Sequence, residues 1–187
     1  MAYLSEEQLN VMGFKNLGIN VKISDKASIY NCEQITIGDH SQIDDFCVIS
    51  GKVTIGKYCR ITPMCLLAGG SMGIILQDYV SLAYGVKIFS QSSDYSGTTV
   101  ASSLIPEKYK KEYKAEVIVE QYSIIGANST ILPGVNVAEG SSIGAMTLIL
   151  KSTAPWGIYI GIPGKRVKDR SREMLKLVDE FNSESNK

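Results

Sequence analysis

The sequence has few of the residues that build transition-metal sites. Its 187 residues include one histidine, His40, and four cysteines, none of them in a Cys-x-x-Cys pair. A zinc site usually needs three or four imidazole or thiolate ligands. The composition therefore predicts a protein without a metal centre.

Net charge and long apolar runs are also missing. Nineteen Lys and Arg residues balance nineteen Asp and Glu residues, so no overall field attracts nucleic acid or an anionic membrane. Apolar runs such as residues 143–150 are far shorter than a membrane span, and residues 1–8 lack the basic and apolar regions of a signal peptide. We therefore expect a cytoplasmic protein with no membrane span and no nucleic-acid partner. A chain with 44% hydrophobic and 20% charged residues is typical of one globular domain.

The prominent feature of the sequence is a six-residue aliphatic repeat. A helix would space its apolar residues three and four apart, and an alternating strand would space them two apart, so neither explains a period of six. Weaker frames of the same period begin at Leu17 and Leu76. The two uninterrupted runs are Ile37, Ile43, Ile49, Ile55, Ile61 and Leu67, and Val119, Ile125, Ile131, Val137, Ile143 and Ile149.

A second residue follows each aliphatic at the fourth position and is small or β-branched, as at Ser41, Cys47, Ser129 and Thr147. An aliphatic that fills a narrow interior, followed by a small inward residue, predicts a parallel β-helix in which each coil stacks on the one below. Glycines and polar residues recur at the corners, where we expect positive backbone φ angles. These are Gly18, Gly38, Gly56, Gly126, Gly134, Gly140, Gly144, Asn20, Asp39, Asp44, Asn128 and Asn136.

The Ile-Gly-x-x-Ser strings at residues 37–41 and 125–129 resemble those of the hexapeptide-repeat acyltransferases. This resemblance implies an all-β solenoid, a left-handed parallel β-helix of about six coils with triangular section, assembled as a homotrimer. It also implies acetyl-CoA as co-substrate. The metal-dependent carbonic anhydrases of the same coil type need three imidazoles, which one histidine cannot supply.

We expect one domain with four kinds of segment. Residues 1–16 form a helical cap, residues 17–93 and 117–154 form the coils, 94–116 form an inserted loop, and 155–187 form a C-terminal turn and helix. Ser5 with Gln8 predicts a capping box, and Gly13 predicts the end of the first helix. The last helix is expected to pack through an apolar face made of Val167, Met174, Leu177, Val178 and Phe181.

Family resemblance also indicates where coenzyme A binds. The string Gly161-Ile162-Pro163-Gly164-Lys165-Arg166 matches the family's coil-closing turn, in which the basic residues would contact phosphates. The pantetheine arm would follow small corner residues of the last coils, which here are Gly126, Ala127, Gly144 and Ala145. Their 18-residue separation places both corners on one edge, and their free amides would bind the ligand.

The residues before the inserted loop point to the acceptor. Many family members place a histidine there as the base for a hydroxyl acceptor, whereas this chain has residues 89–97 without one and His40 stands at a distant corner. A neutral amine is already nucleophilic and needs no strong base, so we predict N-acetylation with Asp94 accepting a proton or orienting the amine. We expect Ser93, Tyr95 and Tyr84 to contact the sugar.

Four strings resemble one branch of the family, the enzymes that acetylate nucleotide-linked amino sugars for bacterial surface polysaccharide. They lie at residues 26–30, 43–47, 94–97 and 143–146. The resemblance implies an acetyl-CoA-dependent N-acetyltransferase for O-antigen or capsule synthesis. Two alternatives stay open: an O-acetyltransferase that acts on a sugar hydroxyl, and a β-helix that binds or assembles without turnover.

Overall fold

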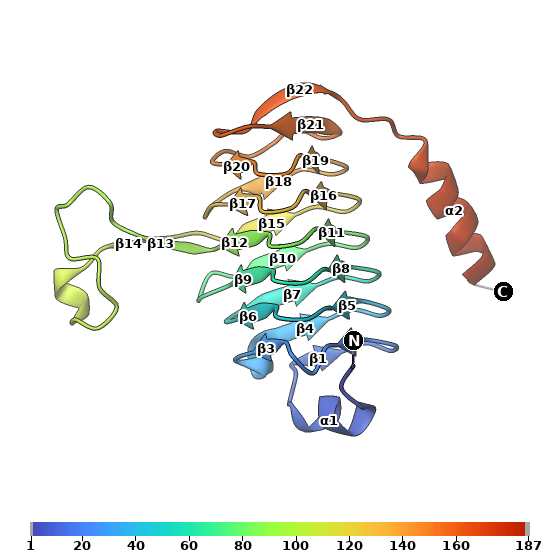
Figure 1. The fold of residues 1–187 in the computed structure, drawn as a ribbon, viewed down its shortest axis with the longest axis horizontal. Helices are drawn as coiled ribbons and strands as arrows, with labels where there is room; N and C mark the ends of the chain where they lie inside the picture. The colour runs from blue at the N-terminus through green and yellow to red at the C-terminus, as the bar shows by residue number, and fades with distance from the viewer. Residues whose placement is uncertain (1, 186–187) are drawn as a thin grey trace.

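The computed structural model describes residues 2–185, which form a column of short strands with one long arm (Figure 1). Three parallel sheets form the sides of the column, and each strand pairs with its counterpart one coil above. Six coils each give one strand to every sheet, and β21 begins a seventh. The predicted parallel solenoid of about six coils is confirmed.

The strands are only a few residues long, as a three-sided coil requires. The first sheet contains β1 (Asn16–Leu17), β4 (Ile35–Ile37), β7 (Val53–Ile55), β10 (Ile74–Leu76), β15 (Val117–Val119) and β18 (Asn136–Val137). The second contains β2 (Lys22–Ile23), β5 (Gln42–Ile43), β8 (Arg60–Ile61), β11 (Ser81–Leu82), β16 (Ile124–Ile125), β19 (Ser142–Ile143), β21 (Gly157–Ile160) and β22 (Lys165–Asp169). The third contains β3 (Ser28–Ile29), β6 (Val48–Ser50), β9 (Leu66–Ala68), β12 (Lys87–Phe89), β17 (Thr130–Ile131) and β20 (Leu148–Ile149).

The six-residue repeat forms the core of the column. Ile43 pairs with Ile61 and Ile125 pairs with Ile143, so each aliphatic stacks on the equivalent residue of the next coil. These side chains are at most 2% exposed. Each contributes about 1.5–3 kcal/mol through burial.

Small polar residues at the fourth position satisfy their own hydrogen bonds inside the column. Ser129 Oγ donates to the carbonyl of Gly144 at 2.8 Å and accepts from the amide of Thr147 at 3.1 Å. Ser41 makes the equivalent pair of bonds with Gly56 and Cys59. A serine hydroxyl at the fourth position can therefore be buried with its hydrogen-bond donor paired.

The corners of successive coils stack into three columns, which we call edges. The first edge joins the first sheet to the second, at residues 18–21, 38–41, 56–59, 77–80, 120–123 and 138–141. The second edge joins the second sheet to the third, at residues 24–27, 44–47, 62–65, 83–86, 126–129 and 144–147. The third edge joins the third sheet to the first sheet of the following coil, and the arm leaves from it.

The prediction of positive φ at glycine and polar corners is largely wrong. Of the residues named for it, Asn20, Asn128, Gly134 and Gly140 have positive φ, and the others do not. Instead, bulky residues hold the left-handed conformation, which costs about 1–2 kcal/mol each. On the first edge their rings stack between coils, which offsets part of this cost. These are His40, Tyr58, Tyr79 and Tyr122, with centroid separations of 4.9, 5.2 and 5.5 Å.

Several corner glycines are needed for space rather than for φ. A Cβ on Gly38 would lie 2.6 Å from the carbonyl carbon of Gly56 in the next coil. One on Gly126 would lie 2.5 Å from the amide nitrogen of Ala145. The close stacking of coils therefore excludes a side chain at these two positions.

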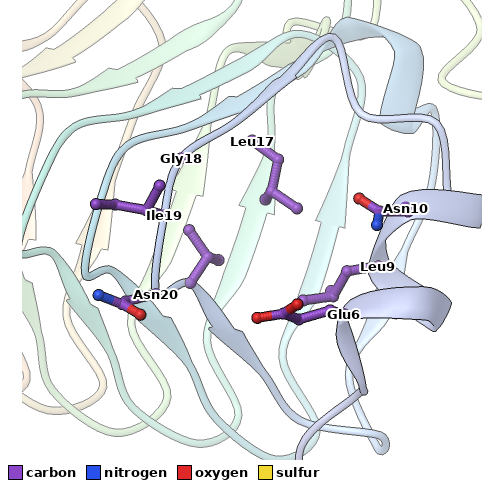
Figure 2. Close-up of a pocket in the computed structure, with 8 residues that line it drawn as sticks. Glu6, Leu9, Asn10, Leu17, Gly18, Ile19 and Asn20 are labelled. Atoms are coloured by element: carbon purple, nitrogen blue, oxygen red, sulfur yellow. The ribbon is translucent and has the colours of Figure 1, made fainter.

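The helix α1 (Glu6–Val11) closes the bottom of the column, as predicted. Ser5 and Gln8 form the capping box, and Gly13 has φ +70° directly after the helix. Leu9 is buried beneath the first coil. The amide of Leu4 donates to the carbonyl of Ile23, so β2, the lowest strand of the second sheet, has a hydrogen-bond partner on its outer side. Figure 2 shows the hollow of about 400 Å³ that remains between α1 and the first coil.

The top of the column is covered by an antiparallel strand, and the helix α2 (Met174–Ser185) then extends down one side (Figure 1). Val167 lies in β22 and not in the helix, so that part of the predicted helical face is wrong. Phe181 places its ring edge on Tyr58 at 5.2 Å, and the Tyr79 hydroxyl donates to Asn182 at 2.7 Å. The helix thus packs on the first edge of its own chain.

The insertion is an arm that projects from the third edge, on the side of the column away from α2 (Figure 1). Its base is the antiparallel pair β13 (Gln91–Ser93) and β14 (Glu112–Lys114), so it begins at Gln91, earlier than the predicted boundary at 94. The spacing from Leu67 to Leu76 is nine residues rather than six, and this longer segment lies beneath the arm, where Ser90 Oγ donates to Gly69. No helix in residues 2–185 has the length and apolarity to cross a membrane.

Candidate active site

The predicted coenzyme corners lie directly above one another on the second edge. Gly126 donates its amide to Ile143 at 2.7 Å, and Met146 donates to the carbonyl of Ala127 at 2.8 Å. The two corners at 126–127 and 144–145 are therefore adjacent, as the 18-residue spacing predicts. Alanine precedes the positive-φ residue at both corners, and we call the strip of surface along these corners the channel.

The free amides of this channel are not those of the glycines. Gly126 and Gly144 both donate within the column, Gly144 to Tyr159 at 2.8 Å, so the expectation that their amides are free is wrong. Within residues 2–185, however, the amides of Tyr84, Ala127 and Ala145 have no hydrogen-bond partner. Each of these three residues precedes the positive-φ corner residue of its coil. The sequence alone did not identify these amides, because the corner residue with positive φ must be known first.

The C-terminal turn closes the same edge from above. Gly161 donates to Thr147 Oγ1 at 3.2 Å and accepts from the amide of Leu148 at 3.1 Å, which fixes the Gly161–Pro163 turn over the corner at 144–147. The Ile162–Pro163 peptide bond is cis. The string that resembles the family's coil-closing turn thus continues the edge formed by the two alanine corners.

The two basic residues of this string are exposed on β22 but differ in their charge environment. Arg166 pairs with Asp169 at 2.7 Å, and this carboxylate raises the pKa of the guanidinium. Lys165 forms no ion pair with any described residue and lies opposite Ile160. Lys165 is therefore the better placed of the two to neutralise a phosphate.

Tyr84 stands on the second edge one coil below Ala127. Its carbonyl accepts from the amide of Asn128 at 2.8 Å, and its side chain is 60% exposed. Below it in the same register come Pro63 and Asp45. The structure therefore places Tyr84 in line with the predicted coenzyme residues.

Asp94 stands near the base of the arm, with its carboxylate held by the loop that follows. Oδ1 accepts from the amide of Ser96 at 2.9 Å, and Oδ2 accepts from the hydroxyls of Thr98 and Thr99 at 2.9 and 2.8 Å. These donors hold the pKa of Asp94 well below its usual range. The group is thus a permanent anion at neutral pH and a weak base, suited to holding an ammonium ion.

The other arm residues named from the sequence are close to Asp94 along the chain. Ser93 pairs with Glu112 in the β13–β14 ladder, and Tyr95 is 92% exposed. All three lie on the arm at the third edge, whereas Tyr84 and the coenzyme residues lie on the second edge. One chain does not bring the two groups together.

Two further polar side chains of the column, Asp44 and His40, lie on different edges. Asp44 is fully buried beside the second edge, where it accepts from Arg60 at 2.8 Å and from Gln42 at 2.7 Å, a pair that the sequence pattern did not reveal. His40 is exposed on the first edge and stacks on Tyr58. It stands apart from every other candidate residue of its own chain.

The cysteines behave as predicted for small core residues. Cys47, Cys59 and Cys65 are buried, and burial raises the pKa of Cys59 to about 12. The Cys59 thiol is therefore protonated at neutral pH and a poor nucleophile. Among residues 2–185, no three His, Cys, Asp or Glu side chains are placed to hold a metal ion.

A stack of hexapeptide coils with a coil-closing turn and an inserted arm defines the class of this protein, and comparisons with known proteins agree. The family model described as "Bacterial transferase hexapeptide (six repeats)" matches residues 34–69. The dTDP-4-amino-4,6-dideoxy-D-glucose acyltransferase of Escherichia coli is 38% identical over 184 residues, which cover 97% of this chain and 95% of that protein. The chain belongs to the hexapeptide-repeat acyltransferase family.

Solved structures show the same similarity. AntD, an N-acyltransferase from Bacillus cereus crystallised with dTDP and 3-hydroxybutyryl-CoA, has a TM-score of 0.97 and 40% identity, with 99% of this chain and 98% of that chain covered. A variant of AntD with asparagine in place of an aspartate, bound to dTDP and coenzyme A, also has a TM-score of 0.97 and 40% identity, over 98% and 100% of the two chains. The likeness therefore extends over the arm as well as the column.

Proposed function

We propose that this protein transfers the acetyl group of acetyl-CoA to the amine of a nucleotide-activated amino sugar, with a dTDP-linked 4-amino-4,6-dideoxy sugar as the preferred acceptor class. The observation that carries the proposal is the continuous second edge, on which a coil-closing turn, two alanine corners and their free amides lie in one line. The Escherichia coli and Bacillus cereus relatives, similar over nearly their whole length, act on or bind ligands of these two kinds.

The chain's residues have distinct roles in this reaction. Lys165 and Arg166 hold the phosphates of the coenzyme nucleotide, and the amides of Ala127 and Ala145 donate to the carbonyls of the pantetheine arm. Gly126, Gly144, Gly161 and Pro163 shape the channel by allowing close stacking and a tight turn. No metal takes part.

Asp94 orients the acceptor amine. Its carboxylate is too weak a base to deprotonate an ammonium ion fully, but it places the nitrogen and stabilises the positive charge that develops on it. The neutral form of the amine attacks the thioester carbonyl through its nitrogen lone pair, the C–N bond forms, and the C–S bond then breaks. The proton lost by nitrogen leaves with the thiolate, so free coenzyme A is released as the thiol.

The complete site needs two copies of the chain in this proposal, and we expect a homotrimer. The arm projects from the column on the side away from α2 (Figure 1), and it exposes Tyr95 and Leu104 by 92% and 93%. Burying such side chains against a neighbouring copy would stabilise the assembly. Ser93 and Tyr95 would then contact the sugar across the interface, and His40 would have no part in proton transfer.

The cysteines bear on the compartment in which the reaction occurs, and the product bears on the use that the cell makes of it. Four free cysteines fit a reducing compartment, and we expect the cytoplasm. The acetylated nucleotide sugar retains its diphosphate, a leaving group for glycosyl transfer. We therefore propose that the product supplies bacterial surface polysaccharide, as O-antigen or capsule.

The test measures thiol release by the purified protein with acetyl-CoA and dTDP-4-amino-4,6-dideoxyglucose. The matched control is the dTDP-sugar with a hydroxyl at C4. We expect saturable turnover with the amine and less than about 1% of it with the hydroxyl. Equal turnover with both sugars would identify an O-acetyltransferase, and no turnover with either, together with no binding of coenzyme A, would identify a binding or assembly protein.

A further inference from the structure

Along the second edge, side-chain size changes abruptly at one position. The residue before the left-handed corner is Ala145 in the highest complete coil, Ala127 in the next, and Tyr84 in the one below. Descending from the coil-closing turn, Tyr84 is therefore the first large side chain in this register. It is 60% exposed, so its ring projects from the edge rather than into the core.

The length of the channel above Tyr84 matches the length of a pantetheine arm. Three coil steps separate the Gly161 turn from Tyr84, through Ala145 and Ala127, and parallel strands are spaced by about 4.8 Å, so the channel is about 14 Å long. A pantetheine arm spans about twelve bonds from its phosphate oxygen to its sulfur. This equals about four residues of extended chain, or about 14 Å. A coenzyme with its nucleotide at Lys165 thus has its sulfur beside Tyr84.

The surroundings of Tyr84 leave the acyl group little freedom. The next residue, Gly85, has no side chain, but Asn128 fills that space, because its Oδ1 lies 2.4 Å from where a Gly85 Cβ would be. Below Tyr84, the register continues with Pro63, and the exposed Met64 follows Pro63 in the chain. An acyl chain longer than acetyl would have to extend into the volume of the tyrosine ring.

We propose that Tyr84 limits the acyl donor of this protein to short chains, acting as the stop at the thiol end of the channel. This inference rests on the proposed function, because it assumes that the coenzyme occupies the second edge. The AntD protein of Bacillus cereus, by comparison, binds 3-hydroxybutyryl-CoA. The donors of proteins related to this chain are therefore not limited to acetyl-CoA.

The test replaces Tyr84 and compares two donors, acetyl-CoA and 3-hydroxybutyryl-CoA. In the Tyr84→Ser variant, the ratio of kcat/KM for the longer donor to that for acetyl-CoA should rise at least about 10-fold, since a few methylene-sized groups in an apolar pocket are worth a factor of 10 or more. The Tyr84→Phe variant keeps the ring and should keep the wild-type ratio. Phe46→Ser, an aromatic-to-serine change on the same edge two coils below, is the matched control and should also keep it.

Binding provides a second readout that does not depend on the acceptor. Calorimetric Kd values for the two acyl-CoA molecules should show the same 10-fold change in ratio in Tyr84→Ser. An unchanged ratio in both assays would overturn the inference, as would a rise in the acceptor KM alone, which would place Tyr84 on the sugar. The proposed function fails separately, when wild-type protein neither binds acetyl-CoA nor releases thiol.

Discussion

The close stacking of coils at Gly126 allows a quantitative test of the edge. In Gly126→Ala, the new Cβ would lie 2.5 Å from the amide nitrogen of Ala145 and 2.6 Å from the carbonyl carbon of Gly144. Both atoms belong to backbone that is held in the next coil, so neither can rotate away. The coils must separate by about 1 Å to restore van der Waals contact at about 3.5 Å.

Separation of the coils has a calculable energetic cost. Overpacking of this kind costs about 1–3 kcal/mol, and the 2.7 Å bond from Gly126 to Ile143 weakens, which costs about 1 kcal/mol more. We therefore expect Gly126→Ala to lower the free energy of unfolding by about 2–4 kcal/mol. In a chain of this length, that lowers Tm by about 5–15 °C.

The assay is thermal unfolding followed by circular dichroism, with Gly97→Ala as the control. Gly97 has φ +81°, and a Cβ added there would meet no atom within 4 Å, so its substitution tests the left-handed backbone alone and should cost about 1 kcal/mol. Coenzyme A affinity should fall in Gly126→Ala and not in Gly97→Ala. The reasoning is refuted if Gly126→Ala unfolds within about 2 °C of the wild type.

Three further predictions concern the charged and aromatic groups. Asp94→Asn should lower turnover at least 10-fold at pH 7, while coenzyme A affinity stays unchanged. Because the pKa of Asp94 in the folded protein lies below its usual value, the carboxylate stays charged as pH falls from 8 to 5. The rate at which a protease cleaves the wild-type arm should therefore be constant over that window. Lys165→Gln should weaken coenzyme A binding about 5-fold or more in low salt, whereas Lys176→Gln on α2 should not, as calorimetry at two ionic strengths would measure. Phe181→Ala removes the edge contact with Tyr58, worth about 1 kcal/mol beyond burial, so trypsin should cleave α2 faster than in wild type while the column stays intact; equal cleavage rates would contradict the packing.

The column was predictable from sequence because every inward residue has the same environment. A narrow interior accepts one aliphatic per side, so a single period of six marks Ile43, Ile61 and Ile125 together. Local signals were equally sufficient at the N-terminal helix, where Ser5 and Gln8 satisfy each other's backbone amides. In both cases the neighbours that matter are close in sequence or fixed by the repeat.

Other features depend on contacts that no local signal carries. Intrinsic preference places glycine or asparagine at positive φ, yet Tyr58 and Tyr79 occupy such corners, where their stacking between coils offsets part of the local strain. Val167 has the spacing of a helical face but is in β22, because the last exposed strand needs a partner. The arm lacks periodicity, so its internal pairing was not predictable.

The arrangement of the candidate site follows from the same coil arithmetic. Tyr84 and Asp94 are ten residues apart in sequence, but the chain turns from the second edge to the third between them, across β12. The base of the arm is then fixed by the amide of Ala115 donating to Ser90 and by the β13–β14 ladder, so the arm cannot fold back onto its own second edge. A reaction that uses both residues therefore requires the arm of one chain to meet the edge of another. Co-expression of an Asp94→Asn chain with a Gly126→Ala chain should then give more activity than either variant has alone.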